Sequence, residues 1–106
     1  MEIRYLETMG EFQEFISGTD KINCVKFGAE WCGPCKALDM TLEAVSEVPD
    51  GARFAFADVE VMTDAAESLG IMNVPSICMF RGGEELDRIV GLCTWPQIRD
   101  RIDSLK

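Results

Sequence analysis

Short apolar segments typical of β-strands alternate along this chain with segments of helical periodicity. Gly82-Gly83, between the last two apolar runs, has the composition of a tight hairpin. Strands that alternate with helices and then close with a hairpin imply a central mixed sheet with helices on both faces. The 106 residues are therefore expected to form one α/β domain, residues 1–106. The expected strands are 3–6, 22–29, 54–59, 76–80 and 85–90, and the expected helices lie between Thr8 and Gly18, from Cys32 to Val48, from Thr63 to Leu69 and from Thr94 to Leu105.

Two of the expected helix starts carry a capping-box pattern, in which a threonine is followed three residues later by Glu or Gln. Thr8 precedes Glu11 at the first, and Thr94 precedes Gln97 at the second, with Pro96 in the first turn. These patterns predict where the first and last helices begin.

The charge balance excludes several classes of partner. Ten Lys and Arg against nineteen Asp and Glu give a net charge of -9, which argues against nucleic acids and anionic membranes. The longest uncharged stretch, Ser68 to Phe80, is broken by Gly70 and Pro75 and is too short to cross a bilayer. The first residues show no secretory signal, so cytoplasm is the expected location. We also expect a monomer.

The number and spacing of the cysteines leave one candidate motif for chemistry. Their odd number, with no export signal, disfavours a framework of structural disulfides. The chain has no histidine, and the spacing supplies no second pair of ligands, so we expect no metal site. What remains is a single Cys-x-x-Cys, formed by two of the five cysteines, Cys24, Cys32, Cys35, Cys78 and Cys93.

The Cys-x-x-Cys motif lies where the second strand leads into the second helix. With Cys32 as the N-cap, the Cys35 N–H is the natural donor to the Cys32 sulfur, since Pro34 has none. The positive end of the helix favours a thiolate at the same place. We therefore expect Cys32 to be the exposed nucleophile and Cys35, within disulfide reach, the buried resolving thiol. Gly33 permits close approach of a partner backbone, and Pro34 stiffens the turn.

The residues around the motif resemble the thioredoxin family over nearly the whole chain. The similar segments are Phe27-Gly28-Ala29-Glu30-Trp31, the motif Trp31-Cys32-Gly33-Pro34-Cys35-Lys36, Gly70-Ile71-Met72-Asn73-Val74-Pro75-Ser76, Phe80-Arg81-Gly82-Gly83 and Val90-Gly91-Leu92. The resemblance implies a thioredoxin fold, a cis peptide bond before Pro75, and a shallow apolar substrate groove that involves Trp31, Val74, Pro75, Gly91 and Leu92.

Thioredoxin-like function follows as a further expectation from this resemblance. It implies reduction of disulfides in partner proteins, with recycling by a flavin-dependent thioredoxin reductase. No cofactor is needed, because the cysteines carry the two electrons. Two alternatives remain open: an oxidant or isomerase that uses the same chemistry, and a binding module whose dithiol acts only as a redox switch.

Lys26 is the main departure from the family pattern. Thioredoxins usually have a buried aspartate at this position, and its usual lysine partner corresponds here to Phe56. Asp39 lies four residues after Cys35, hence on the same side of the helix, and could pair with Lys26. Lys26 is then a charged group that tunes the redox potential, a neutral base for the Cys35 proton, or a solvated residue at a sheet margin. Gly28 and Met40 replace a tryptophan and a helix-kinking proline of many bacterial members.

The other sulfur-containing residues are expected to be structural. Cys24 and Cys78 read as small core residues, and Cys93 as a thiol near the active surface, with a regulatory role as the alternative. Five methionines, Met9, Met40, Met62, Met72 and Met79, are expected to fill the core.

Overall fold

A five-stranded mixed sheet forms the centre of the computed structural model, which describes residues 1, 3–18 and 20–106. The strand order is β1-β3-β2-β4-β5, with β2 parallel to β3 and antiparallel to β4. Within the described residues the strands are β1 (Arg4–Leu6), β2 (Ile22–Gly28), β3 (Ala52–Asp58), β4 (Ser76–Arg81) and β5 (Glu84–Val90), and the helices are α1 (Met9–Ser17), α2 (Gly33–Glu43), α3 (Thr63–Ser68) and α4 (Trp95–Leu105). The element order predicted from the sequence is confirmed.

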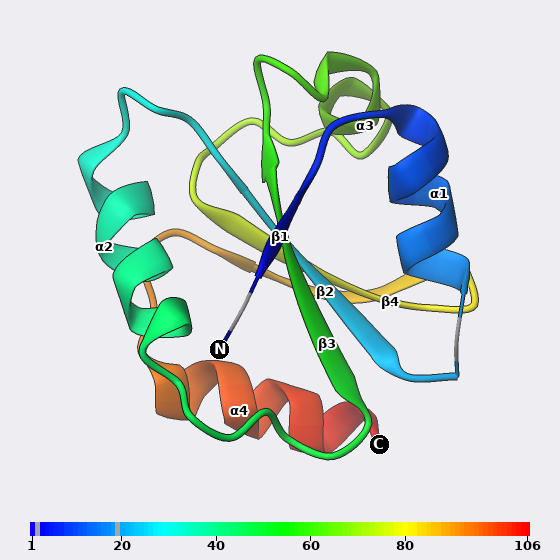
Figure 1. The fold of residues 1–106 in the computed structure, drawn as a ribbon, viewed down its shortest axis with the longest axis vertical. Coiled ribbons are helices and arrows are strands. Elements are labelled where there is room, and N and C mark those ends of the chain that lie inside the picture. Colours follow the sequence, from blue (N-terminus) through cyan, green and yellow to red (C-terminus); the bar gives the residue numbers. More distant parts are fainter. Residues whose placement is uncertain (2, 19) are drawn as a thin grey trace.

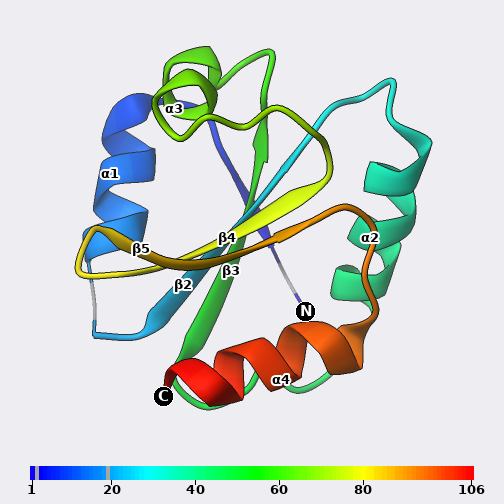
Figure 2. The same ribbon diagram turned by 180° about the vertical axis from the view of Figure 1, so that it is seen from behind.

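Two helices cover each face of the sheet, as Figures 1 and 2 show from opposite sides. On one face, Phe12 and Ile16 of α1 and Ala65 of α3 pack against Val25 and Phe27 of β2. On the other face, α2 and α4 cover the sheet with Leu38, Leu42, Ile98 and Ile102. Because successive strand residues point to opposite faces, Cys24 lies in the α2–α4 core while Val25 lies in the α1–α3 core.

The turns and caps follow their sequence signals. Gly82 and Gly83 join β4 and β5 with φ values of 59° and 84°, a region that L side chains rarely adopt. At the start of α4 both hydrogen bonds of the capping box form between Thr94 and Gln97. At α1 the Thr8 hydroxyl accepts from the Glu11 N–H, whereas the Glu11 carboxylate accepts from the Glu7 N–H, so that box is only half formed.

The second helix is shorter than its apolar periodicity predicts. It ends at Glu43 rather than Val48, and its last turn tightens where the Val45 N–H donates to the Leu42 carbonyl. Val45 is buried but lies in the loop that leads to β3, while Val48 and Ala37 are exposed. A loop residue that covers the end of a core continues the apolar pattern without continuing the helix, so periodicity overestimates the helix length.

The methionine prediction is only partly right. Met62 and Met79 are buried and Met9 is partly buried, but Met40 and Met72 are 73% and 90% exposed. Met40 lies two residues from both Leu38 and Leu42, and therefore on the side of α2 that faces away from the core.

Candidate functional site

Cys32 and Cys35 form a disulfide at the N-terminus of α2, directly after the loop that follows β2. Their Cα atoms are 5.2 Å apart. Cys32 is the N-cap residue, and its Sγ accepts the Cys35 N–H at 3.2 Å. This confirms the capping geometry expected from the sequence. The same N–H and the positive helix end would face a Cys32 thiolate after reduction.

The disulfide is less accessible than expected. Cys32 is 5% exposed and Cys35 is 1% exposed, so the expectation of an exposed Cys32 is wrong for this oxidised state. Val59 and Val74, which are distant in sequence, pack with Ala29 against the two cysteines. The order of accessibility nevertheless matches the expected roles, because Cys35 is the deeper sulfur.

The segment before β4 closes one side of the disulfide. The Val74–Pro75 peptide bond is cis, as the resemblance implied. The carbonyl oxygen of Val74 lies 3.8 Å from Cys32 Sγ, and the Gly91 N–H donates to the Pro75 carbonyl at 2.8 Å. This bond holds the loop that contains Leu92 beside the proline. The structure therefore brings Val74, Pro75 and Gly91 to the site.

Exposed apolar side chains lie on the segments that flank the disulfide. Trp31 is 71% exposed and Leu92 is 58% exposed, and Met72 lies just before Val74. The Trp31 indole N–H donates to the Glu60 carboxylate, which fixes the orientation of the ring. The sequence does not predict Glu60 or Met72 as site residues. Glu60 meets Trp31 only in the folded chain, and Met72 is expected in the core with the other methionines.

Lys26 and Asp39 form an ion pair beneath the disulfide. Lys26 Nζ lies 2.5 Å from Asp39 Oδ1, although the contact lacks hydrogen-bond geometry and Oδ1 makes no hydrogen bond with any described residue. The predicted contact between these residues is therefore present. Lys26 is 5% exposed and lies in a central strand, so a solvated residue at a sheet margin is the wrong description. Its Nζ also lies 4.5 Å from the ring centroid of Phe56, its neighbour on β3.

The other three cysteines lie outside the Cys-x-x-Cys motif as free thiols. Cys24 and Cys78 are fully buried, as expected, and burial raises the pKa of both thiols, that of Cys78 to about 12. Cys93 is half-buried against the α2–α4 core, and burial raises the pKa of its thiol too.

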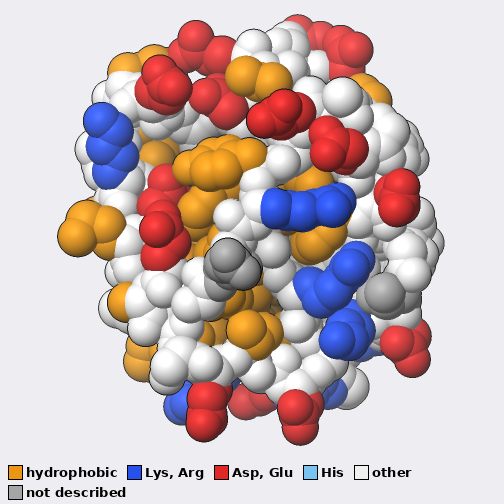
Figure 3. Space-filling model, in the orientation of Figure 1, with side chains coloured by type: hydrophobic (Ala, Val, Ile, Leu, Met, Phe, Trp, Pro, Cys, Tyr) orange, Lys and Arg blue, Asp and Glu red, His pale blue; other side chains and the backbone are white. Residues whose placement is uncertain are grey.

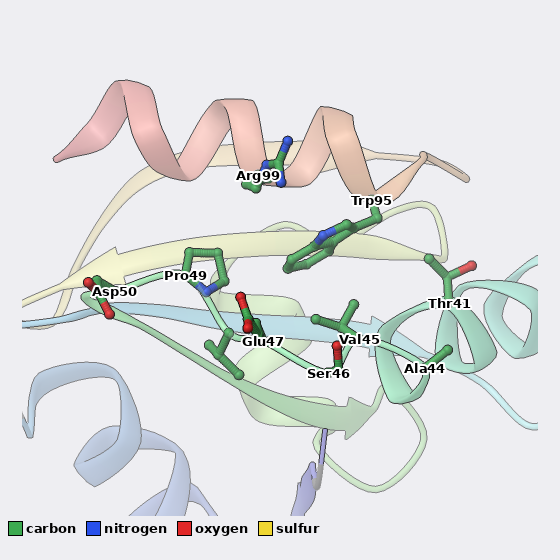
Figure 4. A pocket seen from close by; sticks show the side chains of 10 residues that line it. Thr41, Ala44, Val45, Ser46, Glu47, Pro49, Asp50, Trp95 and Arg99 are labelled. Carbon is green, nitrogen blue, oxygen red and sulfur yellow. The ribbon is translucent and has the colours of Figure 1, made fainter.

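The larger hollows of the surface lie away from the disulfide. One of about 620 Å³ lies between α4 and the loop after α2, and it is lined by Trp95 and Arg99 of α4 and by Glu47 and Pro49 of the loop (Figure 4). Another, of about 650 Å³, is lined by residues that include Arg4, Phe15 and Arg53. Neither is lined by Cys32 or Cys35.

A mixed sheet between helix pairs, with a Cys-x-x-Cys disulfide at a helix N-terminus and a cis-proline beside it, defines a thiol–disulfide oxidoreductase. Residues 4–104 match the family model for thioredoxin, and the chain belongs to the thioredoxin family.

Individual relatives agree with this assignment. The chain is 40% identical over 90 residues to the mitochondrial thioredoxin-2 of Schizosaccharomyces pombe, a match that covers 85% of this chain and 67% of that protein. A solved structure of a mutant thioredoxin from Halobacterium salinarum has a TM-score of 0.85 at 30% identity and covers 96% of this chain and 89% of its own. Fasciola hepatica thioredoxin has a TM-score of 0.88 at 28% identity and covers 98% and 100%.

Proposed function

We propose that this chain reduces disulfides in partner proteins, with Cys32 as the nucleophile and Cys35 as the resolving thiol. The observation that carries the assignment of roles is the hydrogen bond from the Cys35 N–H to Cys32 Sγ at the helix N-terminus. It favours negative charge on Cys32, while Cys35 lies deeper.

The reaction proceeds through two exchanges of sulfur partners. The Cys32 thiolate attacks one sulfur of the substrate disulfide, forms a mixed disulfide and releases the other sulfur as a thiolate. Cys35 then loses its thiol proton to water, and the resulting thiolate attacks Cys32 Sγ, forms the Cys32–Cys35 disulfide and releases the second substrate thiolate. Each released thiolate takes a proton from solvent. Two electrons pass from the dithiol to the substrate, without a bound cofactor.

The substrate segment binds across the cis-proline side of the disulfide. Trp31 and Leu92 supply exposed apolar contacts, and Val74, Pro75 and Gly91 supply the backbone surface next to Cys32. An extended segment that carries the target cysteine can pair with such a backbone, as in strand addition. Apart from its chain neighbours and the nearby backbone of α2, a Cβ at Gly33 would meet no described atom within 4 Å, so the surface beside the motif is open to that segment. Pro34 keeps the first turn of α2 rigid.

Thioredoxins act on disulfide-containing proteins and are themselves reduced by thioredoxin reductase. For this chain we propose a flavin-dependent reductase as the electron donor, action as a monomeric single domain over residues 1–106, and a cytoplasmic location. No helix among the described residues has the length and apolar character needed to cross a membrane. Because one relative is a mitochondrial thioredoxin, fractionation of cells that express the tagged chain is the test of location.

Insulin reduction with dithiothreitol as electron donor tests the proposed activity. We expect the wild type to precipitate insulin rapidly and Cys32→Ser to show only the background rate of dithiothreitol. Cys35→Ser, which cannot resolve the intermediate, should accumulate mixed disulfides that mass spectrometry identifies at Cys32. Cys93→Ser is the matched control and should retain wild-type turnover. A wild type no faster than Cys32→Ser would favour a redox-switched binding module.

A further inference from the structure

The ammonium of Lys26 shares a buried space with the sulfur of Cys35. A Cβ placed on Gly28 would lie 2.7 Å from Lys26 Nζ and 3.3 Å from Cys35 Sγ. Both atoms therefore border the space that a larger side chain at position 28 would fill. Gly28 lies at the end of β2, two residues after Lys26 and on the same side of the strand. The missing side chain at Gly28 thus makes room for a cation next to the disulfide.

Asp39 holds the ammonium in this space. It lies one turn after Cys35 on α2 and pairs with Lys26 at 2.5 Å. The Asp39 carboxylate therefore fixes the end of the Lys26 side chain on the side of α2 that carries Cys35. A small hollow leads from the surface to this pair, and its other titratable lining groups are Tyr5, Glu30, Lys36 and Asp58.

We infer that Lys26, positioned by Asp39 and accommodated by Gly28, stabilises the thiolate form of the Cys32–Cys35 dithiol and makes this chain a weaker reductant than it would be with a neutral residue at position 26. This inference rests on the proposed disulfide chemistry and adds a positioning residue to it. In the disulfide neither sulfur carries charge, so the cation stabilises the oxidised form only slightly. In the reduced protein it attracts the thiolate, and that attraction is lost when the disulfide forms.

The redox equilibrium with glutathione measures this effect directly. The dithiol and one oxidised glutathione exchange two electrons to give the protein disulfide and two reduced glutathiones. We expect Lys26→Met to raise the equilibrium constant for oxidation of the protein by about tenfold. This is the effect that a change of one pKa unit in the thiol pair would have. The difference from wild type should grow as pH rises through the titration of the wild-type thiols, because only the thiolate interacts with the cation. A purely structural role for Lys26 would not produce this pH dependence.

Gly28→Ala is a second variant that leaves Lys26 in the sequence. Its new Cβ would meet Lys26 Nζ at 2.7 Å and displace the flexible end of that side chain, and it would also lie 3.3 Å from Cys35 Cβ and Sγ. We expect the equilibrium constant to rise here as well, by a smaller factor. Lys106→Met removes one positive charge from an exposed pair at the C-terminal end of α4 and should leave the constant unchanged.

Three results would overturn the inference. In the first, neither Lys26→Met nor Gly28→Ala changes the equilibrium constant. In the second, Lys26→Met slows release of the mixed disulfide at an unchanged constant, which would make Lys26 a base for Cys35. In the third, Lys106→Met has as large an effect as Lys26→Met. If Lys26→Met does not fold, Gly28→Ala decides. The glutathione equilibrium can be measured even if insulin is not reduced, so failure of the proposed function is separate from failure of this inference.

Discussion

Cys32 differs from the other cysteines of this chain by its place as the N-cap of α2. Cys32 caps the helix and accepts the Cys35 N–H, whereas Cys24 and Cys78 are fully buried in the strands. Cys93 lies outside the motif and has a pKa raised by burial. A raised pKa leaves the unreactive thiol dominant until higher pH, because the thiolate is the nucleophile.

We predict that iodoacetamide labels Cys32 first when the fully reduced protein is treated briefly near pH 7. The helix N-terminus and the Cys35 N–H both favour the Cys32 thiolate, while burial disfavours the thiolates of Cys24, Cys78 and Cys93. Labelling of Cys93 should become appreciable only at alkaline pH. Peptide mass spectrometry identifies the modified residue, and predominant label on Cys35 or Cys93 at pH 7 would contradict the assignment of the nucleophile.

At the level of single residues, the sequence predicts contacts between near neighbours and misses those made by distant segments. The cap from Cys35 to Cys32 and the Lys26–Asp39 pair depend on helix spacing and on one strand–helix junction, and both were predicted. The burial of Cys32 depends on Val59 and Val74, whose positions follow only from the assembled sheet. The space that Gly28 leaves for Lys26 also follows only from the assembled fold. A glycine in a wholly buried strand is nevertheless a sign in the sequence that a neighbouring group approaches closely there.

At the level of elements, helix α4 begins at a complete capping box. The Thr94 hydroxyl accepts from the Gln97 N–H at 3.3 Å, and the Gln97 side chain accepts from the Thr94 N–H at 2.8 Å. The first turn of α4 is followed by Ile98 and Ile102, which are fully buried against the sheet. Loss of the cap therefore weakens a helix that shares the cover of one sheet face with α2.

We predict that Thr94→Ala lowers the free energy of unfolding of the oxidised protein by about 1 kcal/mol. The substitution removes the side-chain acceptor for an otherwise unsatisfied N–H at the helix start. Thr94→Ser keeps an acceptor and should recover most of the loss. Urea denaturation followed by circular dichroism measures both variants, and equal stability of Thr94→Ala and the wild type would show that the box does not stabilise α4.

Element order was predictable for this chain, while several boundaries were not. Turn glycines and capping residues mark their own positions, so the β4–β5 hairpin and the start of α4 appear where expected. The end of α2 has no comparable signal, because Ala44 closes the helix without a glycine. Apolar residues such as Val45 then extend the pattern into a loop that packs on the core.

At the scale of the whole molecule, the net charge of -9 is distributed unevenly. On the face in Figure 3, most Asp and Glu side chains lie toward the rim, while several Lys and Arg side chains gather right of centre and another lies at the left edge. Arg4, Lys21 and Arg53 line the hollow of about 650 Å³, which does not include the disulfide. Acidic residues instead accompany the site, where Glu30, Asp58 and Glu60 line a hollow with Trp31. The surface beside Trp31 is therefore expected to be negative.

This negative surface leads to a prediction about salt. A disulfide peptide with flanking lysines should be reduced faster at low salt than a matched peptide with flanking glutamates, by about tenfold, because charge steering raises the encounter rate. The Debye length shrinks to about 8 Å at 0.15 M ionic strength, so the two rates should converge as salt is added. Stopped-flow measurement of Trp31 and Trp95 fluorescence during reduction supplies the rate constants.

A third peptide with flanking serines controls for salt effects on the chemistry itself, and its rate should change little. Equal salt dependence for all three peptides would contradict electrostatic steering and leave apolar contact at Trp31 and Leu92 as the basis of recognition.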